Sequence, residues 1–256
     1  MKNQTLKEKL RKRENTIGSW ITIGHQAIVE ILAEAGFDWL TIDIEHTSID
    51  LNELQVLIGF IQSHGMAALV RVSKNEEVII KRVLDAGADG IIVPMICSKG
   101  EAEAAVGFAK YPPSGKRGVG LDRAQRYGFG FEEYKEWVEK NLIIICQIEH
   151  IDAVNNIEEI INVNGVDGIL IGPYDLSGSL GIPGNYNEPI VQDALRKVEQ
   201  ICLAHKKTMG FHVIEPDSAL VIEKQKAGYN FIAFSTDFLF LGKKAFEEMD
   251  KLKLAE

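Results

Sequence analysis

The chain has 256 residues, the size of one large α/β domain or two small ones. Its formal net charge of −9 argues against nucleic acid or an anionic membrane surface as a partner, and no apolar run is long enough to span a bilayer. Residues 1–15 are charged, lack the apolar core of a signal peptide and predict an exposed leading helix. Cys97, Cys146 and Cys202 fit neither a disulfide framework nor a CxxC metal motif, which predicts reduced thiols in a cytoplasmic protein.

Short apolar runs alternate with helical patterns along the chain. Strands are predicted at 16–23, 37–43, 67–72, 89–94, 142–148, 166–171, 208–213 and 231–235. Helices are predicted at 27–35, 51–63, 76–86, 101–110, 131–140, 151–161, 189–205, 217–227 and 238–253. Eight strands without a linker between halves predict a single (β/α)8 TIM barrel over residues 1–256. An open doubly wound sheet is the alternative, but residues 18–24 lack its glycine-rich dinucleotide loop.

Four phrases of the chain resemble one another: AGFDWLTID, AGADGIIVP, VDGILIGP and AGYNFIAFS. We interpret them as repeated helix-to-strand joints of one architecture. Residues 111–130 form a long turn-rich segment without periodicity of its own. A connection of this kind is usually functional, and it fits either a lid or a segment that crosses to a neighbouring subunit.

Polar side chains follow several of the predicted strands. In (β/α)8 barrels these strand ends form the active-site face, and polar groups there are costly unless they are paired, ligated or used. The candidates are Asp43, Glu45, His46, Arg71, Gln147, Glu149, Asp175 and His212.

Glu149 and Asp175 follow neighbouring strands, so the sequence predicts two carboxylates that point at one space. Such a pair is stable if one group is protonated or a cation bridges both. Oxygen-only ligation favours Mg²⁺ or Mn²⁺, with Co²⁺ also compatible. Two protein ligands would leave positions for water and for a 2-oxo acid that chelates through its keto and carboxylate oxygens. The structural alternative is that Glu149 caps the following helix and Asp175 caps a turn.

Arg71 and His46 are the candidates for substrate binding and proton transfer. A guanidinium is a permanent cation that can hold a carboxylate or stabilise an enolate, although Arg71 could equally form a salt bridge to Glu45 or Asp43. An imidazole titrates near neutrality, which makes His46 the best candidate general base, although a lone histidine after a strand is more often structural. Gln147 could bind a substrate oxygen.

Two absences narrow the chemistry. A Schiff-base aldolase needs a lysine on a barrel strand near the mouth, and the predicted strands carry none. A phosphate site would call for glycine-rich turns after the seventh and eighth strands, which are also missing. The sequence therefore argues against imine catalysis and against sugar-phosphate isomerases.

Nearly the whole chain resembles the metal-dependent class II pyruvate aldolases, which include 4-hydroxy-2-oxoheptanedioate and 2-keto-3-deoxy-sugar-acid aldolases. The motifs that carry the resemblance are AGFDWLTIDIEH (35–46), VRVS (70–73), VPM (93–95), YPPSGKRGVG (111–120), QIE (147–149) and IGPYDLSGSLGIPGN (171–185). Several such motifs in the right order are more specific than any one of them.

The resemblance implies a role for each matching residue. Glu149 and Asp175 would hold the metal, His46 would transfer the proton, and Arg71 would stabilise the pyruvate enolate. Substrate contacts would come from Arg71, Gln147, Gly172, Pro173, Tyr174 and Asp175.

The resemblance also implies two features that the predicted topology does not explain. An aspartate matching Asp85 is credited with raising the basicity of the histidine, yet Asp85 ends a helix at the opposite face of the barrel, unless a neighbouring subunit supplies it. The resemblance also implies a hexamer that is built from dimers, in which the two subunits of each dimer exchange their last helix. Five apolar residues fit a buried C-terminal helix: Phe238, Leu239, Phe240, Leu241 and Phe246.

The sequence departs from the family pattern in places. Tyr174 stands where a small residue is frequent, and His25 and His212 stand where small or apolar residues are common. An inward-pointing Tyr174 or His212 would alter the aldehyde pocket, so aldehyde preference does not carry over.

The predicted function is reversible, metal-dependent retro-aldol cleavage of a 4-hydroxy-2-oxo acid to pyruvate and an aldehyde, by a homo-oligomer. One alternative is a citrate-lyase-like CoA-thioester lyase, for which a basic patch would bind the CoA phosphates. Its members would be Lys116, Arg117, Arg123 and Arg126. Oxaloacetate decarboxylation uses the same enolate, and a non-catalytic metabolite-binding barrel is the alternative outside enzymes.

Overall fold

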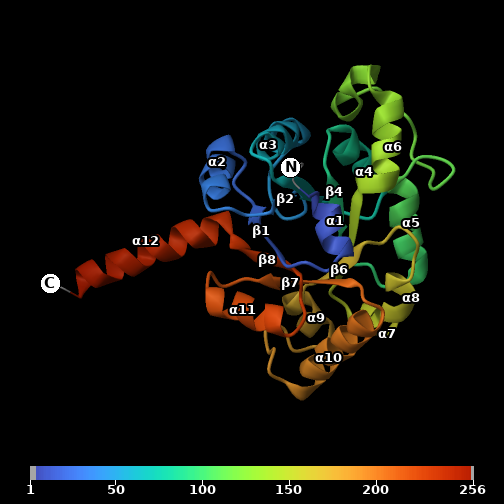
Figure 1. The fold of residues 1–256 in the computed structure, drawn as a ribbon. Helices are drawn as coiled ribbons and strands as arrows, with labels where there is room; N and C mark the ends of the chain where they lie inside the picture. The colour runs from blue at the N-terminus through green and yellow to red at the C-terminus, as the bar shows by residue number, and fades with distance from the viewer. Residues whose placement is uncertain (1–3, 255–256) are drawn as a thin grey trace.

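Eight parallel strands close into a barrel in chain order in the computed structural model, which describes residues 4–254 (Figure 1). The strands are β1 Thr16–Ile21, β2 Trp39–Asp43, β3 Ala67–Arg71, β4 Gly90–Val93, β5 Ile143–Ile148, β6 Gly168–Ile171, β7 Thr208–Val213 and β8 Phe231–Thr236. The helices are α1 Leu6–Arg11, α2 Gln26–Glu34, α3 Leu51–Ser63, α4 Glu77–Asp85, α5 Lys99–Ala109, η1 Arg123–Gly128, α6 Phe131–Asn141, α7 Ile151–Asn155, α8 Ile157–Ile161, α9 Pro173–Ser179, α10 Pro189–Ala204, α11 Ser218–Lys226 and α12 Asp237–Lys253. The predicted (β/α)8 barrel is confirmed.

Three segments differ from the predicted elements. The helix predicted at 151–161 is two short helices, α7 and α8, which meet at Asn156. The helix α9, which begins two residues after β6, is absent from the prediction. The turn-rich segment at 111–130 contains one short 3₁₀ element, η1.

A repeated side-chain hydrogen bond explains the four similar phrases. In each phrase an Asp or Asn stands just before an even-numbered strand, and its side-chain oxygen accepts the N–H at the start of the preceding odd-numbered strand, at 2.8–3.0 Å. The acceptors are Asp38, Asp89, Asp167 and Asn230, and the donors are Ile17, Ala68, Ile144 and Met209, in that order. The same pairs also bond in the reverse direction, from backbone N–H to backbone C=O. Each pair of strands is therefore fixed in register at its amino end.

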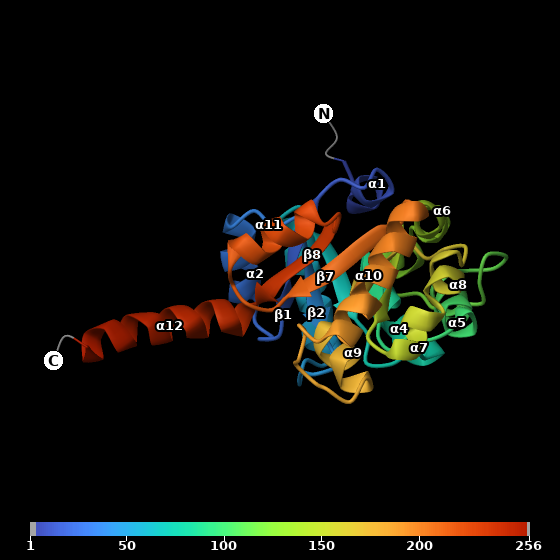
Figure 2. The ribbon, with the colours of Figure 1, turned by 90° about the horizontal axis from the view of Figure 1, so that it is seen from below.

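The leading helix α1 covers the amino ends of the strands. Figure 2 shows α1 at one end of the barrel and α9 at the other. Leu6 and Leu10 are buried in the cluster of side chains that fills the barrel. The prediction of an exposed helix is wrong because one face of this highly charged segment is apolar and seals the barrel.

Lysines of α1 neutralise two of the buried aspartates. Lys7 Nζ lies 3.0 Å from Asp167 Oδ1, and its side chain is only 6% exposed. Lys9 Nζ lies 2.5 Å from Asp38 Oδ1. Two of the charged residues that predict an exposed segment therefore form ion pairs with aspartates of the barrel.

Glycines make room for two large aromatic rings in the barrel. Trp39 and Phe231 stack with ring centroids 4.2 Å apart. A Cβ atom at Gly18 would lie 2.0 Å from the Trp39 ring, and one at Gly210 would lie 2.8 Å from Phe231. The interior below the site is therefore filled, so that ligands can approach only from the carboxyl ends of the strands.

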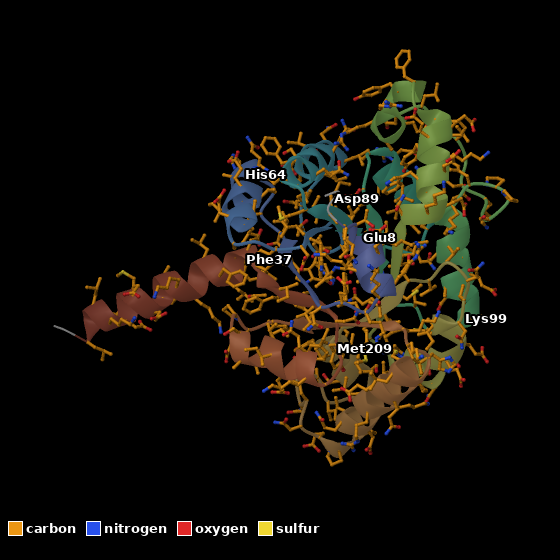
Figure 3. All side chains as sticks on the ribbon, in the orientation of Figure 1. Glu8, Phe37, His64, Asp89, Lys99 and Met209 are labelled. Atoms are coloured by element: carbon orange, nitrogen blue, oxygen red, sulfur yellow. The ribbon has the colours of Figure 1, made fainter. Side chains whose placement is uncertain are left out.

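The last helix leaves the body of the protein. Figures 1 and 3 show α12 and its side chains extending away from the barrel beyond Phe37. Phe240 packs near the start of the helix, with its ring centroid 6.4 Å from that of Phe37, but Leu241 is 64% exposed and Phe246 is 72% exposed. The prediction of a buried C-terminal helix is wrong for the single chain. Among the described residues, no helix is long and apolar enough to cross a membrane.

The Lys7–Asp167 pair gives the first testable prediction. Lys7→Ala leaves the largely buried Asp167 carboxylate without its cation, and we expect the free energy of unfolding to fall by about 3 kcal/mol. Urea denaturation measures this change. The matched control is Lys12→Ala, whose amino group is exposed and lies 4.0 Å from Glu14, for which we expect less than about 1 kcal/mol. If the Lys7 variant is as stable as the control, the Lys7–Asp167 ion pair does not stabilise the fold.

Candidate active site

A small cavity of about 60 Å³ opens at the carboxyl ends of the strands. Its walls come from β1, β3, β5, β6 and β7 and from the first turn of α9. The polar lining residues are Trp20, Arg71, Gln147, Tyr174, Asp175 and His212. Gly172 and Pro173, both predicted to contact substrate, also line it. The structure thus brings together residues that are up to 192 positions apart, because the barrel collects its strand ends at one mouth.

Glu149 is buried and held by two hydrogen bonds. Its Oε1 accepts the backbone N–H of Met95 at 2.8 Å, and its Oε2 accepts the Gln147 side-chain amide at 2.5 Å. Met95 adopts a left-handed backbone, with φ of +52°, which is costly for a residue other than glycine. Burial raises the pKa of Glu149 against these two hydrogen bonds, and the charge of nearby Asp175 raises it further.

Asp175 lies in the first turn of α9, and the loop before this helix approaches Glu149 closely. A Cβ atom at Gly172 would lie 2.9 Å from Glu149 Oε2, so only glycine allows this approach. Neither carboxylate makes the capping bond of the structural alternative. The cap of α7 is His150 rather than Glu149, and α9 has no side-chain capping bond. Both carboxylates therefore remain available to a ligand.

Arg71 is anchored by a bidentate ion pair. Its Nε and Nη2 donate to the two oxygens of Asp43 at 3.0 and 2.7 Å, and its guanidinium lies 4.4 Å above the Trp20 ring. Burial disfavours the Asp43 anion, but the hydrogen bonds and charge of Arg71 outweigh burial and hold the pKa of Asp43 below its ordinary value. The predicted salt bridge is present, and it orients the guanidinium in the wall of the cavity.

His46 lies on the rim of the site rather than in the cavity wall. Its side chain is 67% exposed, and its Nε2 lies 3.4 Å from Glu45 Oε2. The loop that carries it is tied to β2, since Asp43 Oδ1 accepts the backbone N–H of Glu45 at 3.0 Å. Burial raises the pKa of Glu45, with Arg71 opposing and Glu149 adding to the increase. Glu45 thus connects the rim histidine electrostatically with the buried carboxylate.

Asp85 lies apart from this group in the single chain. It is the last residue of α4, and its Oδ1 lies 2.6 Å from Arg117 Nη2. The buried Arg117 guanidinium in turn lies over the rings of Tyr111 and Tyr134, at 4.7 and 5.5 Å. Asp85 therefore anchors the 111–130 segment, and none of the described residues of the cavity wall contacts it.

The charge at the mouth suits a divalent cation. Four carboxylates face one arginine, and two of the four, Asp43 and Glu45, already contact that arginine. Glu149 and Asp175 remain, and both offer the hard oxygen ligands that Mg²⁺ and Mn²⁺ prefer. Gln147 Oε1 is a further buried oxygen without a hydrogen-bond partner in the described part of the chain. No group of three or more His, Cys, Asp or Glu side chains within residues 4–254 is arranged to hold a metal, so the protein would contribute two carboxylates.

Residues 16–241 match the family described as HpcH/HpaI aldolase/citrate lyase. The chain belongs to this family. The family covers the whole barrel from β1 to the start of α12, which agrees with the resemblance carried by the sequence motifs. The prediction of an enzyme of the class II aldolase type is therefore confirmed at the level of the family.

Named relatives cover most of the chain. A 2-keto-3-deoxy-L-rhamnonate aldolase of Escherichia coli O17:K52:H18 is 36% identical over 233 residues, which are 90% of this chain and 86% of the relative. An HpcH/HpaI aldolase/citrate lyase family protein from Burkholderia cenocepacia J2315 superposes with a TM-score of 0.91 at 31% identity, covering 97% of this chain and 98% of the relative. An HpcH/HpaI aldolase from Desulfitobacterium hafniense DCB-2 gives a TM-score of 0.89 at 30% identity, covering 98% of this chain and 97% of the relative.

The Arg71–Asp43 pair predicts a pH-dependent contribution to stability. Asp43→Asn should lower the free energy of unfolding by about 3 kcal/mol at pH 7, because it removes the bidentate anion from a largely buried arginine and leaves only the longer contact with Glu45. Because the pKa of Asp43 is lowered in the fold, this contribution is complete above the ordinary carboxyl pKa of about 3.9 and is lost as the pH falls through the lower folded value.

Thermal unfolding of parent and variant from pH 7 to pH 2 measures this dependence. We expect the difference in unfolding free energy to shrink as the pH falls below about 4. The control is Asp193→Asn, an exposed carboxylate paired with Arg196, which should change the unfolding free energy by less than about 1 kcal/mol throughout. A difference between parent and Asp43→Asn that is constant with pH would contradict the electrostatic explanation.

Proposed function

We propose that this enzyme cleaves a 4-hydroxy-2-oxo acid reversibly to pyruvate and an aldehyde. The observation that carries the proposal is the convergence of Glu149, Asp175 and Arg71 at the mouth of a barrel of the HpcH/HpaI family. The 36% identity to a 2-keto-3-deoxy-L-rhamnonate aldolase supports a sugar-acid substrate of that chemical class.

The carboxylates of Glu149 and Asp175, which form no ion pair in the described part of the chain, would hold the metal. A divalent ion bound by Glu149 and Asp175, with Mg²⁺, Mn²⁺ and Co²⁺ all compatible, would polarise the 2-oxo group of the substrate. Gln147 and the first turn of α9, with Gly172, Pro173 and Tyr174, would contact the oxygens of the 2-oxo acid. The burial of Glu149 and the glycine beside it support this arrangement.

Different side chains at the mouth would transfer the proton and stabilise the negative charge. His46 would take the proton from the C4 hydroxyl as the C3–C4 bond breaks, and the bond electrons would move into the 2-oxo group to form the pyruvate enolate. Arg71 would counter the negative charge of the enolate, which its fixed orientation on Asp43 supports. Return of the proton to C3 would give pyruvate, and Asp85 from a neighbouring subunit would assist His46.

The neighbouring subunit would come from an oligomer. We propose a homo-oligomer, a hexamer by resemblance, in which α12 packs on a partner. Its exposed apolar side chains include Phe238, Leu241, Phe246, Met249 and Leu252. A helix that exposes this much apolar surface is typical of an interface. The free thiols of Cys97, Cys146 and Cys202 support a reducing, cytoplasmic location.

The CoA-lyase alternative has less support. Among the residues of the suggested basic patch, Arg117 is buried against Asp85, and Arg123 donates to Ala86 O and Gln62 Oε1 at 2.9 and 3.0 Å. Arg126 is paired with Glu133. Three of the four cations are thus committed to contacts within the chain.

The exchange of the pyruvate methyl protons tests the central proposal. In D₂O the enzyme with Mg²⁺ should replace the methyl protons by deuterium, as followed by NMR, and the metal-stripped enzyme should not. Glu149→Gln keeps the size of the side chain but removes the negative charge and one of the two acceptor oxygens, so we expect at least a tenfold weaker Mg²⁺ affinity by calorimetry. The control Glu158→Gln, on the outer helix α8, should bind Mg²⁺ as the parent does. Folded parent protein that shows no exchange with Mg²⁺, Mn²⁺ or Co²⁺ would count against the aldolase.

Replacement of His46 tests the proton transfer separately. His46→Ala should reduce the rate of retro-aldol turnover by about 100-fold or more, as loss of a general base does, while Mg²⁺ affinity is unchanged. The stability should also be nearly unchanged because the side chain is exposed. His64→Ala, at the end of α3, is the control. Turnover equal to that of the control would exclude His46 as the base.

A further inference from the structure

A second histidine lies inside the mouth of the barrel, where the family resemblance leads one to expect a small or apolar residue. His212 is the fifth residue of β7 and lines the cavity together with Arg71, Gln147 and Asp175. Its ring packs against Trp20, with the two ring centroids 5.5 Å apart and the planes inclined by 54°. Packing against the indole and the strand fixes the direction of the imidazole, so it forms a rigid part of the cavity wall.

The imidazole carries a buried nitrogen without a partner. Within residues 4–254, His212 Nε2 has no hydrogen-bond partner, and the same holds for Trp20 Nε1 and Gln147 Oε1 in the wall of the same cavity. Leaving a buried polar group unsatisfied costs about 1–3 kcal/mol. The two nitrogens can each donate to a ligand, and this is the pattern expected of a binding site whose ligand completes the hydrogen bonds.

The surroundings of His212 determine which form of the imidazole is present. Burial lowers the pKa of His212 to about 4, and the positive charge of Arg71 lowers it in the same direction, against the opposing effect of Asp43. The imidazole is therefore neutral near pH 7 and carries one N–H group. A group with this pKa is a weak base at neutral pH, so His212 does not compete with His46 for proton transfer.

The ligand can be inferred from the chemistry of the wall. The cavity is small, at about 60 Å³, and Arg71, Gln147 and His212 line it together. The Arg71 guanidinium makes the cavity attractive to an anionic or polarised oxygen. The keto and carboxylate oxygens of a 2-oxo acid accept hydrogen bonds but do not donate them, so Nε2 must supply its proton to them.

We propose that His212 binds the 2-oxo acid directly, by donating a hydrogen bond from Nε2 to a keto or carboxylate oxygen. The inference rests on the proposed function for the identity of the ligand and adds a substrate-binding residue to that site. In this chain the oxygens of the ligand would thus accept hydrogen bonds from two sides of the cavity, from Arg71 on β3 and from His212 on β7.

Binding of pyruvate, measured by calorimetry with Mg²⁺ present, tests the inference without turnover. His212→Phe keeps a ring against Trp20 but removes both nitrogens, and we expect the Kd for pyruvate to rise roughly tenfold, the effect of one hydrogen bond. His212→Gln keeps an N–H donor and should recover most of the affinity. His212→Leu is a second apolar variant in case the Phe variant does not fold. His64→Phe, at the outer end of α3, is the matched control.

A stability measurement separates binding from packing. If the nitrogen serves the ligand, the Phe variant should unfold at the same temperature as the parent or higher, because it buries one unsatisfied polar atom fewer. Parent affinity in an apolar variant would overturn the inference, since Nε2 would then contact only water. Loss of affinity in the Gln variant equal to that in the Phe variant would overturn it as well.

The same experiments distinguish failure of the inference from failure of the proposed function. Absence of methyl exchange in the parent enzyme would reject the aldolase. Normal exchange in the parent, with unchanged pyruvate affinity in His212→Phe, would reject only the role of His212. The pH dependence of turnover gives a further readout. Replacement of a neutral donor should leave its inflections in place, whereas replacement of a base would shift them.

Discussion

The register of the barrel depends on four side-chain acceptors at its amino end, which are partly or fully buried. Asp38, Asp89, Asp167 and Asn230 each bind the first N–H groups of the preceding strand, so each strand pair is fixed before it reaches the mouth. In a parallel barrel a shift of one residue would turn every inward side chain outward. The positions of the candidate site residues at the opposite end therefore depend on hydrogen bonds made at the amino end of the barrel.

This arrangement requires charge compensation at both ends of the barrel. At the amino end the cost of burying Asp167 and Asp38 is offset by Lys7 and Lys9 of α1. At the mouth, by contrast, Arg71 is shared between Asp43 and Glu45, and within residues 4–254 the carboxylates of Glu149 and Asp175 form no ion pair with a cationic side chain. The protein thus neutralises the acids that fix its fold and leaves uncompensated the acids that would bind a metal. This difference between the two ends is the strongest physical argument for the site.

The sequence predicts the barrel and most of the site because both depend on local patterns. A buried strand followed by a polar residue places that residue at the mouth, which is why Arg71, Gln147, Asp175 and His212 could be named and now line one cavity. The roles assigned to these residues, and to His46 and Glu149, stay predictions. Trp20 was missed because its apolar ring looks like ordinary core, although it too ends a strand.

Features of α1 and α12 that the sequence did not predict depend on contacts between segments that are distant in the chain. The burial of α1 was hidden by its many charges, since nothing local reveals that Lys7 and Lys9 meet aspartates more than 25 residues away. The helix α9 is short and contains glycine, so its period is too weak to recognise. The apolar residues of α12 predicted a buried helix, but the chain itself leaves several of them exposed.

The two histidines of the mouth show how one side-chain type takes different roles on one scaffold. His46 is exposed on a loop beside the carboxylate of Glu45, where its imidazole is open to solvent. His212 packs against Trp20 inside the barrel, where burial and the positive charge of Arg71 lower its pKa and favour a neutral imidazole. When two histidines of one site lie in such different surroundings, we expect one to serve in proton transfer and the other in binding. If His212 binds the ligand as proposed, the histidine on β7 would add a fixed polar contact without adding a second base. The chain would then recognise its 2-oxo acid more selectively, while proton transfer would belong to His46.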